Sequence, residues 1–226
     1  MPISHINDTL DDLSISERLR YIYKCYAADE ILLTSSFGTS SAFLLYHISL
    51  FDTKPDIYFI NTGFLFSATI KYREELEKLF KLNVIDVRPA HDDHSFTEYE
   101  KLWETDPDSC CFLNKVKPLN EIKSRFKVWV TGLMANQPGS RDNLSIVQKD
   151  GDILKFNPLF DQDPAHINDL LRELKVPLHP LLQEGYDSVG CLQCTTRGAG
   201  RSGRWSGLDK TECGLHSNVK RKTSKE

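Results

Sequence analysis

The sequence has no long apolar run and almost no excess of charge. No stretch approaches the roughly 20 apolar residues that a membrane-spanning helix needs, and the first nine residues mix His, Asn and Asp where a signal peptide has an apolar segment. Lys and Arg number 28 against 32 Asp and Glu, so the net charge of −4 gives no overall attraction to nucleic acid or to anionic membrane. We therefore expect a cytoplasmic protein that has neither nucleic acid nor a membrane as its partner.

Internal repeats and low-complexity segments are also missing, which excludes a solenoid. A chain of 226 residues buries enough apolar surface to fold without disulfides. In a cytoplasmic protein the six cysteines therefore indicate chemistry rather than structural bridges. Cys25 is the exception, because it lies within the first predicted helix and is expected in the core.

Short apolar runs alternate with periodic segments of helical length. A capping box at Ser14 and Glu17 opens the first helix. Strand–helix alternation of this kind predicts βαβ units, and hence an α/β fold with a parallel, doubly wound sheet. We expect residues 1–180 to form a nucleotide-binding core and residues 181–226 to form a C-terminal arm rich in Cys and Arg. The predicted strands are 31–34, 56–60, 84–87, 126–131 and 153–156, and the predicted helices are 18–27, 42–50, 67–81 and 163–174.

The loop after the first predicted strand is rich in small hydroxyl residues. In a doubly wound sheet, such a turn directs backbone N–H groups and a helix N-terminus at an anion, and the hydroxyl groups add donors. We interpret the loop as a phosphate cradle, with a serine-rich turn that only caps the helix as the alternative. The residues of the cradle are Ser35, Ser36, Phe37, Gly38, Thr39 and Ser40.

Two residue types are absent from this loop. It has no Lys before its Ser or Thr, which excludes a P-loop for triphosphates. It also has no Asp, unlike the pyrophosphatase loops that read Ser-Gly-Gly-x-Asp-Ser and help to place Mg²⁺. A ligand with one bridging phosphate and no metal fits better. The turn Asn61-Thr62-Gly63, after the second strand, is expected beside the loop at the carboxyl edge of the sheet.

Five of the cysteines fall into three sites. Cys191 and Cys194 form a CxxC metal half-site, and the adjacent Cys110 and Cys111 complete a four-thiolate set only if the fold brings the pairs together. Adjacent cysteines suit a zinc ribbon poorly. From their spacing alone, an iron–sulfur cluster, a zinc ion and a redox dithiol remain open. The segment 91–94, His-Asp-Asp-His, is interpreted as a solvated loop that caps a helix at Ser95 rather than as a metal site.

Cys213 stands near the end of the chain in the segment Glu212-Cys213-Gly214-Leu215-His216. It is either an inert thiol or a nucleophile on a mobile arm, in which case positive neighbours must stabilise its thiolate. Arg197, Arg201 and Arg204 supply such charge and are suited to gripping an anion.

Together these motifs resemble the adenylyl-sulfate and phosphoadenylyl-sulfate reductases of assimilatory sulfate reduction, in their cluster-bearing form. The resemblance runs from about Leu33 to His216. The Glu-Cys-Gly-Leu-His motif combined with the two cysteine pairs is highly specific. The other matching segments are 35–38, 61–66, 110–119, 157–159, 185–195 and 203–205.

The resemblance implies a fold of the adenine-nucleotide alpha-hydrolase type and a 4Fe–4S cluster on Cys110, Cys111, Cys191 and Cys194. It implies that Cys213, with His216 as a second catalytic residue, attacks the sulfur of adenylyl sulfate. AMP then leaves, and thioredoxin or a glutaredoxin-like dithiol donor cleaves the Cys S-sulfonate to give sulfite. The implied substrate-binding residues are those of the two loops together with Lys115, Arg141, Arg201 and Arg204. A homo-oligomer is compatible with this interpretation.

Three positions depart from the family's pattern. Asn61 stands where an acid is usual, Asn114 replaces an Arg, and Met134-Ala135 replace a pair of Arg. Fewer arginines agree with adenylyl sulfate as substrate, because it lacks a 3′-phosphate. The rival interpretations are a phosphoadenylyl-sulfate reductase, a nucleotide pyrophosphatase and a non-catalytic metal or redox module.

Overall fold

A mostly parallel sheet forms the centre of the computed structural model, which describes residues 3–135 and 144–216. Its strands follow the order β3-β2-β1-β4-β6-β5, and every neighbouring pair is parallel except β5 with β6. The predicted α/β class is therefore confirmed, with an antiparallel edge strand that the sequence did not reveal. The strands are β1 (Ile31–Ser35), β2 (Asp56–Ile60), β3 (Asn83–Val87), β4 (Val128–Val130), β5 (Val147–Asp150) and β6 (Ile153–Phe156).

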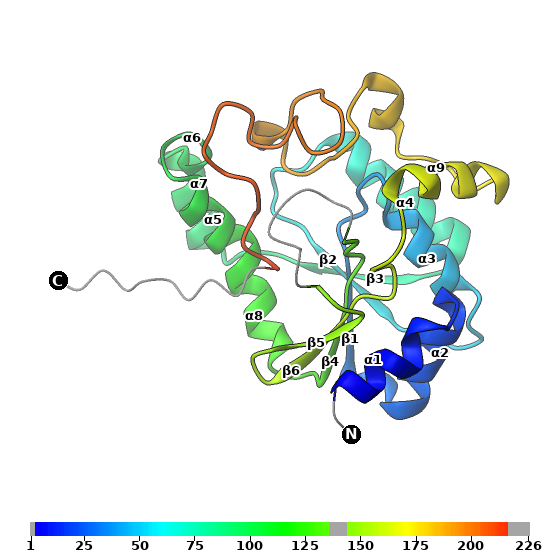
Figure 1. Cartoon of the computed structure of the whole chain (residues 1–226). Coiled ribbons are helices and arrows are strands. Elements are labelled where there is room, and N and C mark those ends of the chain that lie inside the picture. Colours follow the sequence, from blue (N-terminus) through cyan, green and yellow to red (C-terminus); the bar gives the residue numbers. More distant parts are fainter. Residues whose placement is uncertain (1–2, 136–143, 217–226) are drawn as a thin grey trace.

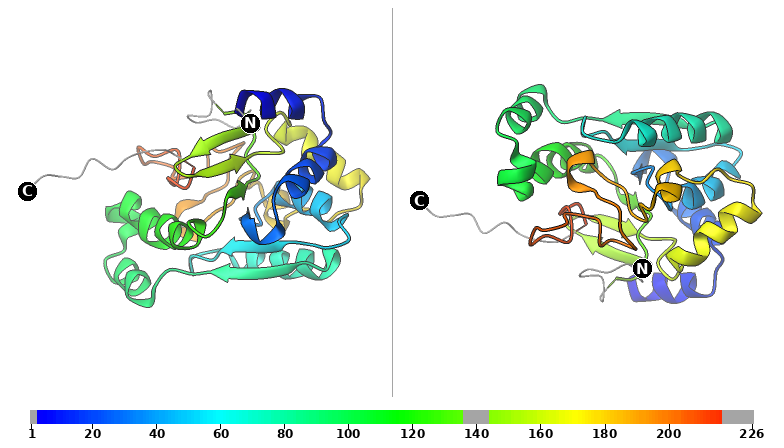
Figure 2. Two further views of the ribbon diagram at one scale, coloured as in Figure 1. Left: turned by 90° about the horizontal axis from the view of Figure 1, so that it is seen from below. Right: turned by 90° about the horizontal axis from the view of Figure 1, so that it is seen from above.

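Helices cover both faces of the sheet (Figure 2). The larger core lies on one face, where Ile31 and Leu33 of β1 pack with the apolar sides of the helices around α3. Leu32 points to the other face and packs with Leu119 of α8, as the alternation of side chains along a strand requires. The helices are α1 (Ile3–Asp11), α2 (Ile15–Cys25), α3 (Ser41–Ser49), α4 (Ser67–Phe80), α5 (His91–Tyr99), α6 (Leu102–Thr105), α7 (Pro107–Cys111), α8 (Lys117–Lys123) and α9 (Pro164–Glu173).

Most predicted elements lie where the pattern placed them. The capping box at Ser14 and Glu17 is formed in full and opens α2. Two expectations were wrong. Residues 91–94 do not form a loop that caps a helix at Ser95, because α5 already begins at His91. Cys25 is exposed, and it is the last residue of α2 rather than an interior one.

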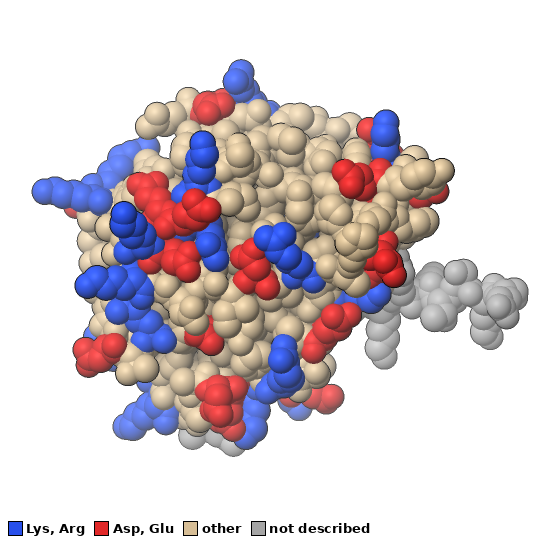
Figure 3. All heavy atoms as spheres, turned by 180° about the vertical axis from the view of Figure 1, so that it is seen from behind, with Lys and Arg blue, Asp and Glu red and all other residues tan. Residues whose placement is uncertain are grey.

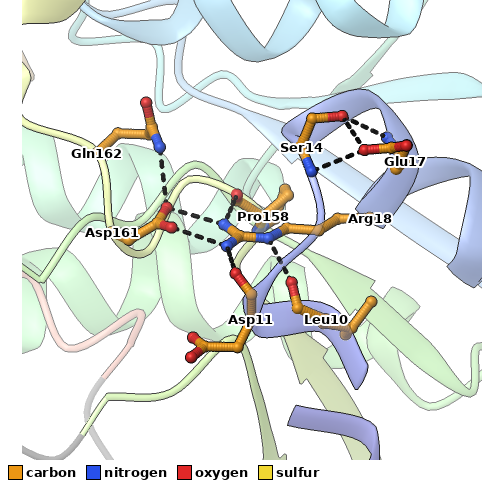
Figure 4. Close-up of polar contacts among 8 residues, drawn as sticks. All are labelled: Leu10, Asp11, Ser14, Glu17, Arg18, Pro158, Asp161 and Gln162. Carbon is orange, nitrogen blue, oxygen red and sulfur yellow. Dashed lines mark hydrogen bonds and ion pairs between the residues drawn. The ribbon is translucent and has the colours of Figure 1, made fainter. Parts of the chain in front are cut away.

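A buried arginine ties the N-terminal helices to the chain that follows β6 (Figure 4). Arg18 is 2% exposed and donates to the backbone carbonyls of Leu10, Asp11 and Pro158 at 2.9, 3.0 and 3.1 Å. Its two terminal nitrogens also bind the carboxylate of Asp161 at 2.8 and 2.7 Å. This network holds the Pro158–Asp161 turn, which leads from β6 into α9.

The C-terminal segment crosses the carboxyl ends of the strands, where it is coloured orange and red in Figure 1. It contains the short helical turns Pro180–Glu184 and Leu192–Cys194. It is attached to the core at several points: Thr39 donates to the carbonyl of Asp187 at 2.7 Å, and Leu65 pairs with Cys191 in an isolated bridge. The boundary at residue 180 stays a prediction.

The surface carries no single dominant charge on the face shown in Figure 3, where acidic and basic side chains are interspersed. Among residues 3–135 and 144–216, no helix combines the length and the apolar content that crossing a membrane requires.

Candidate active site

A cavity of about 510 Å³ lies at the carboxyl edge of the sheet, between the loop after β1 and the C-terminal segment. It brings together hydroxyl, basic and thiol side chains from the two ends of the chain. The predicted site residues that line it are Ser35, Ser36, Gly38, Thr39, Ser40, Thr62, Lys115, Arg201, Arg204, Cys213 and His216.

The loop after β1 is shaped by a buried aromatic residue. Phe37 has a positive φ of 48° and is fully buried, with its ring 5.3 Å from that of Phe59 on β2. Its backbone N–H donates to Ser35 Oγ at 3.2 Å. The Phe37 side chain therefore anchors the loop in the core and does not line the cavity. This anchoring turns the small residues Ser36 and Gly38 towards the open space.

Asn61 and Gly63 also lie outside the cavity wall. The side-chain amide of Asn61 donates to Asp86 on β3 at 2.8 Å, and its carbonyl oxygen accepts from the N–H of Gly63 at 3.2 Å. Gly63 has a φ of 79°, and a side chain there would collide with the ring of His94. These contacts shape the turn after β2, while the neighbouring Thr62 faces the cavity. Arg141 lies outside the described residues.

Four buried cysteines gather beside the cavity. Cys111, Cys191 and Cys194 pack in one cluster with the rings of Phe64 and Trp205, and Cys213 borders it. Cys110 is buried as well, and burial together with the neighbouring thiols raises its pKa to about 12. All six cysteines are free of disulfides.

Local hydrogen bonds position each of the two cysteine pairs beside the cavity. Asp106 accepts from the N–H of Ser109 at 3.0 Å and caps α7, whose last residues are Cys110 and Cys111. The N–H of Leu192 donates to the carbonyl of Phe64 at 2.7 Å and fixes the other pair against the turn after β2. Within the described residues, no three His, Cys, Asp or Glu side chains are arranged around a single metal ion.

Lys115 links the thiols to the cavity. It sits in a π-helical segment, Phe112–Val116, that directly follows α7; such segments are frequent at functional sites. Burial opposes the charged form of Lys115, but the thiols of Cys191, Cys111 and Cys213 outweigh it and raise its pKa. Lys115 therefore places its ammonium group beside the thiols at the wall of the cavity.

Two arginines, Arg201 and Arg204, line the cavity together with Lys115. Arg204 donates to the carbonyl of Val189 at 3.2 Å and lies over the ring of Trp205 at 4.6 Å. A side chain at Gly190 would collide with the Arg204 guanidinium. Burial, followed by the nearby charge of Arg201, lowers the pKa of Arg204.

Arg201 is held by the segment that carries the candidate nucleophile. Its Nη2 donates to the carbonyl of Thr211 at 3.0 Å and to the carboxylate of Glu212 at 3.1 Å. Cys213, the next residue, is half-buried and lines the cavity.

Several residues at this site carry no signal in the sequence. Trp129 lines the cavity from the middle of β4, and Ser188 and Gly190 line it from the C-terminal segment. His216 stacks on Trp129, with ring centroids 5.1 Å apart. Because these contacts join residues that are distant along the chain, no local spacing could have predicted them.

Comparisons with known proteins point to one family. Residues 30–197 match the family model described as the phosphoadenosine phosphosulfate reductase domain. A phosphoadenosine 5'-phosphosulfate reductase of Gloeobacter violaceus is 32% identical over 95% of this chain and 93% of its own length. An adenosine 5'-phosphosulfate reductase of Streptomyces coelicolor is 35% identical over 92% of this chain and 90% of its own. The crystal structure of phosphoadenylyl-sulfate reductase from Candida auris, a phosphate complex, superposes with a TM-score of 0.73 at 27% identity, over 86% of this chain and 96% of that one.

Proposed function

This chain belongs to the phosphoadenosine phosphosulfate reductase family, and from that premise we propose that it reduces adenylyl sulfate to sulfite and AMP in sulfate assimilation. It is an oxidoreductase that acts on a sulfur group. The observation that carries the proposal is the position of Cys213: its thiol lines the same cavity as the hydroxyl loop after β1 and the basic residues Lys115 and Arg204.

Substrate binding is assigned to the two ends of the cavity. The loop of small residues, Ser35 to Ser40, directs backbone N–H and hydroxyl donors at the bridging phosphate. Lys115, Arg201 and Arg204 neutralise the charge of the phosphosulfate, and preorganised charges of this kind stabilise a leaving phosphate as it forms. Arg141 belongs to the same set by its motif. Asn61, Gly63 and Phe37 support the loops from behind.

The chemistry begins with the thiolate of Cys213. It attacks the sulfur of adenylyl sulfate, a new S–S bond forms, and the bond from sulfur to the bridging oxygen breaks. AMP leaves with that electron pair, and a sulfonate stays on Cys213. Splitting the reduction into two displacements lowers the barrier of each. We keep His216 as a second catalytic residue, because it also lines the cavity.

A dithiol donor completes the reaction. One of its thiolates attacks Cys213 Sγ and expels sulfite, and its second thiol then resolves the mixed disulfide, so that the donor is oxidised by two electrons. We assign thioredoxin, or a glutaredoxin-like protein, to this step, because a potential near −270 mV suits it. The cytoplasm, where such donors keep thiols reduced, is the proposed setting.

The four buried cysteines fit a 4Fe–4S cluster. All four are buried free thiols: Cys111, Cys191 and Cys194 pack in one cluster, and Cys110 precedes Cys111 at the end of α7. Four thiolates are the donor set of a 4Fe–4S cluster. Cys110, Cys111, Cys191 and Cys194 would hold it. When bound, it supplies a charged iron–sulfide core next to Lys115.

The choice of adenylyl sulfate over phosphoadenylyl sulfate rests on missing charge. Asn114 stands where the family has an arginine. It is buried and donates to Thr97 at 2.8 Å and to the carbonyl of Cys110 at 2.9 Å, so this position carries a neutral side chain with a structural role. Met134 is fully buried where the family carries an arginine. Phosphoadenylyl sulfate is the second candidate, because relatives of both names match the chain.

The test is an intact-mass measurement after incubation with each nucleotide and no reductant. We expect adenylyl sulfate to add one sulfonate to the protein and to release one AMP. The Cys213→Ser variant gains no mass, whereas Cys25→Ser, which removes an exposed thiol away from the cavity, behaves as wild type. AMP release from wild type without a mass change contradicts the covalent route, and faster labelling by phosphoadenylyl sulfate reverses the substrate assignment.

A further inference from the structure

Cys213 lies in the segment of residues 210–216, which we call the strap. The C-terminal end of the strap packs against the sheet. Leu215 packs in an apolar cluster with Leu32, Leu119 and Trp129. In Figure 1 the red end of the chain runs down between α8 and the strands of the sheet. The end of the strap is therefore packed against this cluster through the partly buried Leu215.

Trp129 gives the strap a fixed surface. Its indole N–H donates to Thr34 Oγ1 on β1 at 2.8 Å, which sets the orientation of the ring. The imidazole of His216 lies nearly parallel to that ring, with an interplanar angle of 19°. Trp129 itself is fully buried in β4, so the strap end stacks on a group that cannot shift without the sheet.

Lys155 contacts both Trp129 and the end of the strap. It is 1% exposed on β6, its ammonium donates to the backbone carbonyl of His216 at 3.4 Å, and it lies 5.1 Å from the centre of the Trp129 ring. A buried charge requires polar partners. The strap provides one of them, so withdrawal of the strap removes a hydrogen bond from a buried cation. Lys155 does not line the cavity.

We infer that Lys155 and Trp129 are positioning residues for Cys213, because they hold the strap end through Leu215 and His216. Two residues of chain span at most about 7 Å, so fixing Leu215 confines the reactive sulfur to a small region of the cavity. The inference rests on the proposed function for its catalytic consequence. The docking itself is independent of the nucleotide.

A neighbouring lysine offers a matched control. Lys123 of α8 also lies over the Trp129 ring, at 4.6 Å, but it pairs with Asp150 of β5 at 2.5 Å. Lys155→Met and Lys123→Met therefore remove the same charge from the same ring. Only the first removes a contact with the strap.

The first measurement is the alkylation rate of Cys213 in the full chain without nucleotide, with the exposed Cys25 as an internal reference. We expect at least a fivefold increase in Lys155→Met and no change in Lys123→Met. The second is single-turnover sulfonation of Cys213 at saturating adenylyl sulfate, together with the Kd for AMP. We expect Lys155→Met to slow sulfonation about tenfold while the Kd for AMP stays within twofold.

Leu215→Ser tests the same docking from the strap side and cannot disturb the sheet, so it decides the matter if Lys155→Met fails to fold. It too should expose Cys213 to alkylation. Equal alkylation rates in wild type, Lys155→Met and Leu215→Ser overturn the inference, as does an equal effect of the two lysine variants. If wild type forms no sulfonate, the proposed function fails, while the alkylation rates still decide whether the strap is docked as inferred.

Discussion

Arg201 binds the residue that precedes the candidate nucleophile: its Nη2 lies 3.1 Å from the carboxylate of Glu212. Both side chains are largely buried, at 18% and 19% exposure, and both line the cavity. An arginine assigned to an anionic substrate is thus already opposed by an internal anion. If Arg201 binds the substrate as proposed, the strap and the substrate share one cation.

Replacing Glu212 should therefore strengthen the binding of anions. In Glu212→Gln, Arg201 retains its charge without a carboxylate beside it, and an ion pair of this exposure is worth about 1 kcal/mol. We expect the Kd for AMP, measured by calorimetry, to fall about fivefold.

Asp209→Asn is the control for this prediction, because it removes the same charge from an exposed position nearby in the sequence. It should leave the Kd unchanged at moderate salt. If both variants tighten binding equally, the effect reflects net charge and not the release of Arg201.

Iron should depend on the cysteines that gather beside the cavity. Protein purified without oxygen is expected to be brown and to contain roughly four irons per chain. Cys194→Ser should lose most of the iron and the colour, because Cys194 is buried in the thiol cluster. Cys25→Ser should lose neither. A colourless wild-type protein with one zinc per chain would refute the cluster.

Acid should weaken the fold through His179. Burial lowers the pKa of this residue to about 4 from its usual 6.5, and its ring is hydrogen-bonded to Thr69 and to the N–H of Leu181. Between these two pH values the unfolded chain binds a proton that the folded chain does not bind. The free energy of unfolding therefore falls as the pH drops from 6.5 to 4, by at most about 3 kcal/mol from this residue.

Urea titrations at several pH values measure this contribution. His179→Gln lacks the titrating group, so its stability should fall less steeply than that of wild type over the same window. Parallel curves for the two proteins would show that His179 does not contribute.

The Arg18 network predicts unequal effects from its two partners. Arg18→Met leaves buried carbonyls of Leu10 and Pro158 without their donor and removes the ion pair, which should cost about 3 to 5 kcal/mol. Asp161→Asn should cost about 1 kcal/mol, because the carboxylate is 42% exposed and Arg18 keeps its backbone acceptors. Urea denaturation gives both values, and equal losses would mean that the ion pair dominates the network.

Local patterns in the sequence were sufficient for the framework of the fold. The run Asp56–Ile60 and the periodic segment that starts at Ser67 are a strand and a helix with those starting points, because pleat and helix periods are properties of consecutive residues. The edge strand β5 was missed, because Val147 is the only apolar residue among its four.

The chemistry-bearing residue types were also evident from the sequence. The hydroxyl loop, the paired cysteines and Cys213 stand out by composition and by motif, whatever their positions in space. Their roles remain proposals, because a motif names a side chain but not the groups that surround it. Arg201 illustrates this point: it was expected to be available to substrate, and it is paired with Glu212.

The sequence by itself determined the order of strands and helices along the chain and the set of reactive side chains. Only the tertiary structure decided that Cys213, Lys115 and the loop after β1 share one cavity, and that the strap ends on Trp129 and Lys155. The physical reason is how far apart along the chain the interacting residues lie. Backbone periodicity is set by near neighbours, whereas contacts between residues 60 to 180 positions apart depend on how the whole core packs.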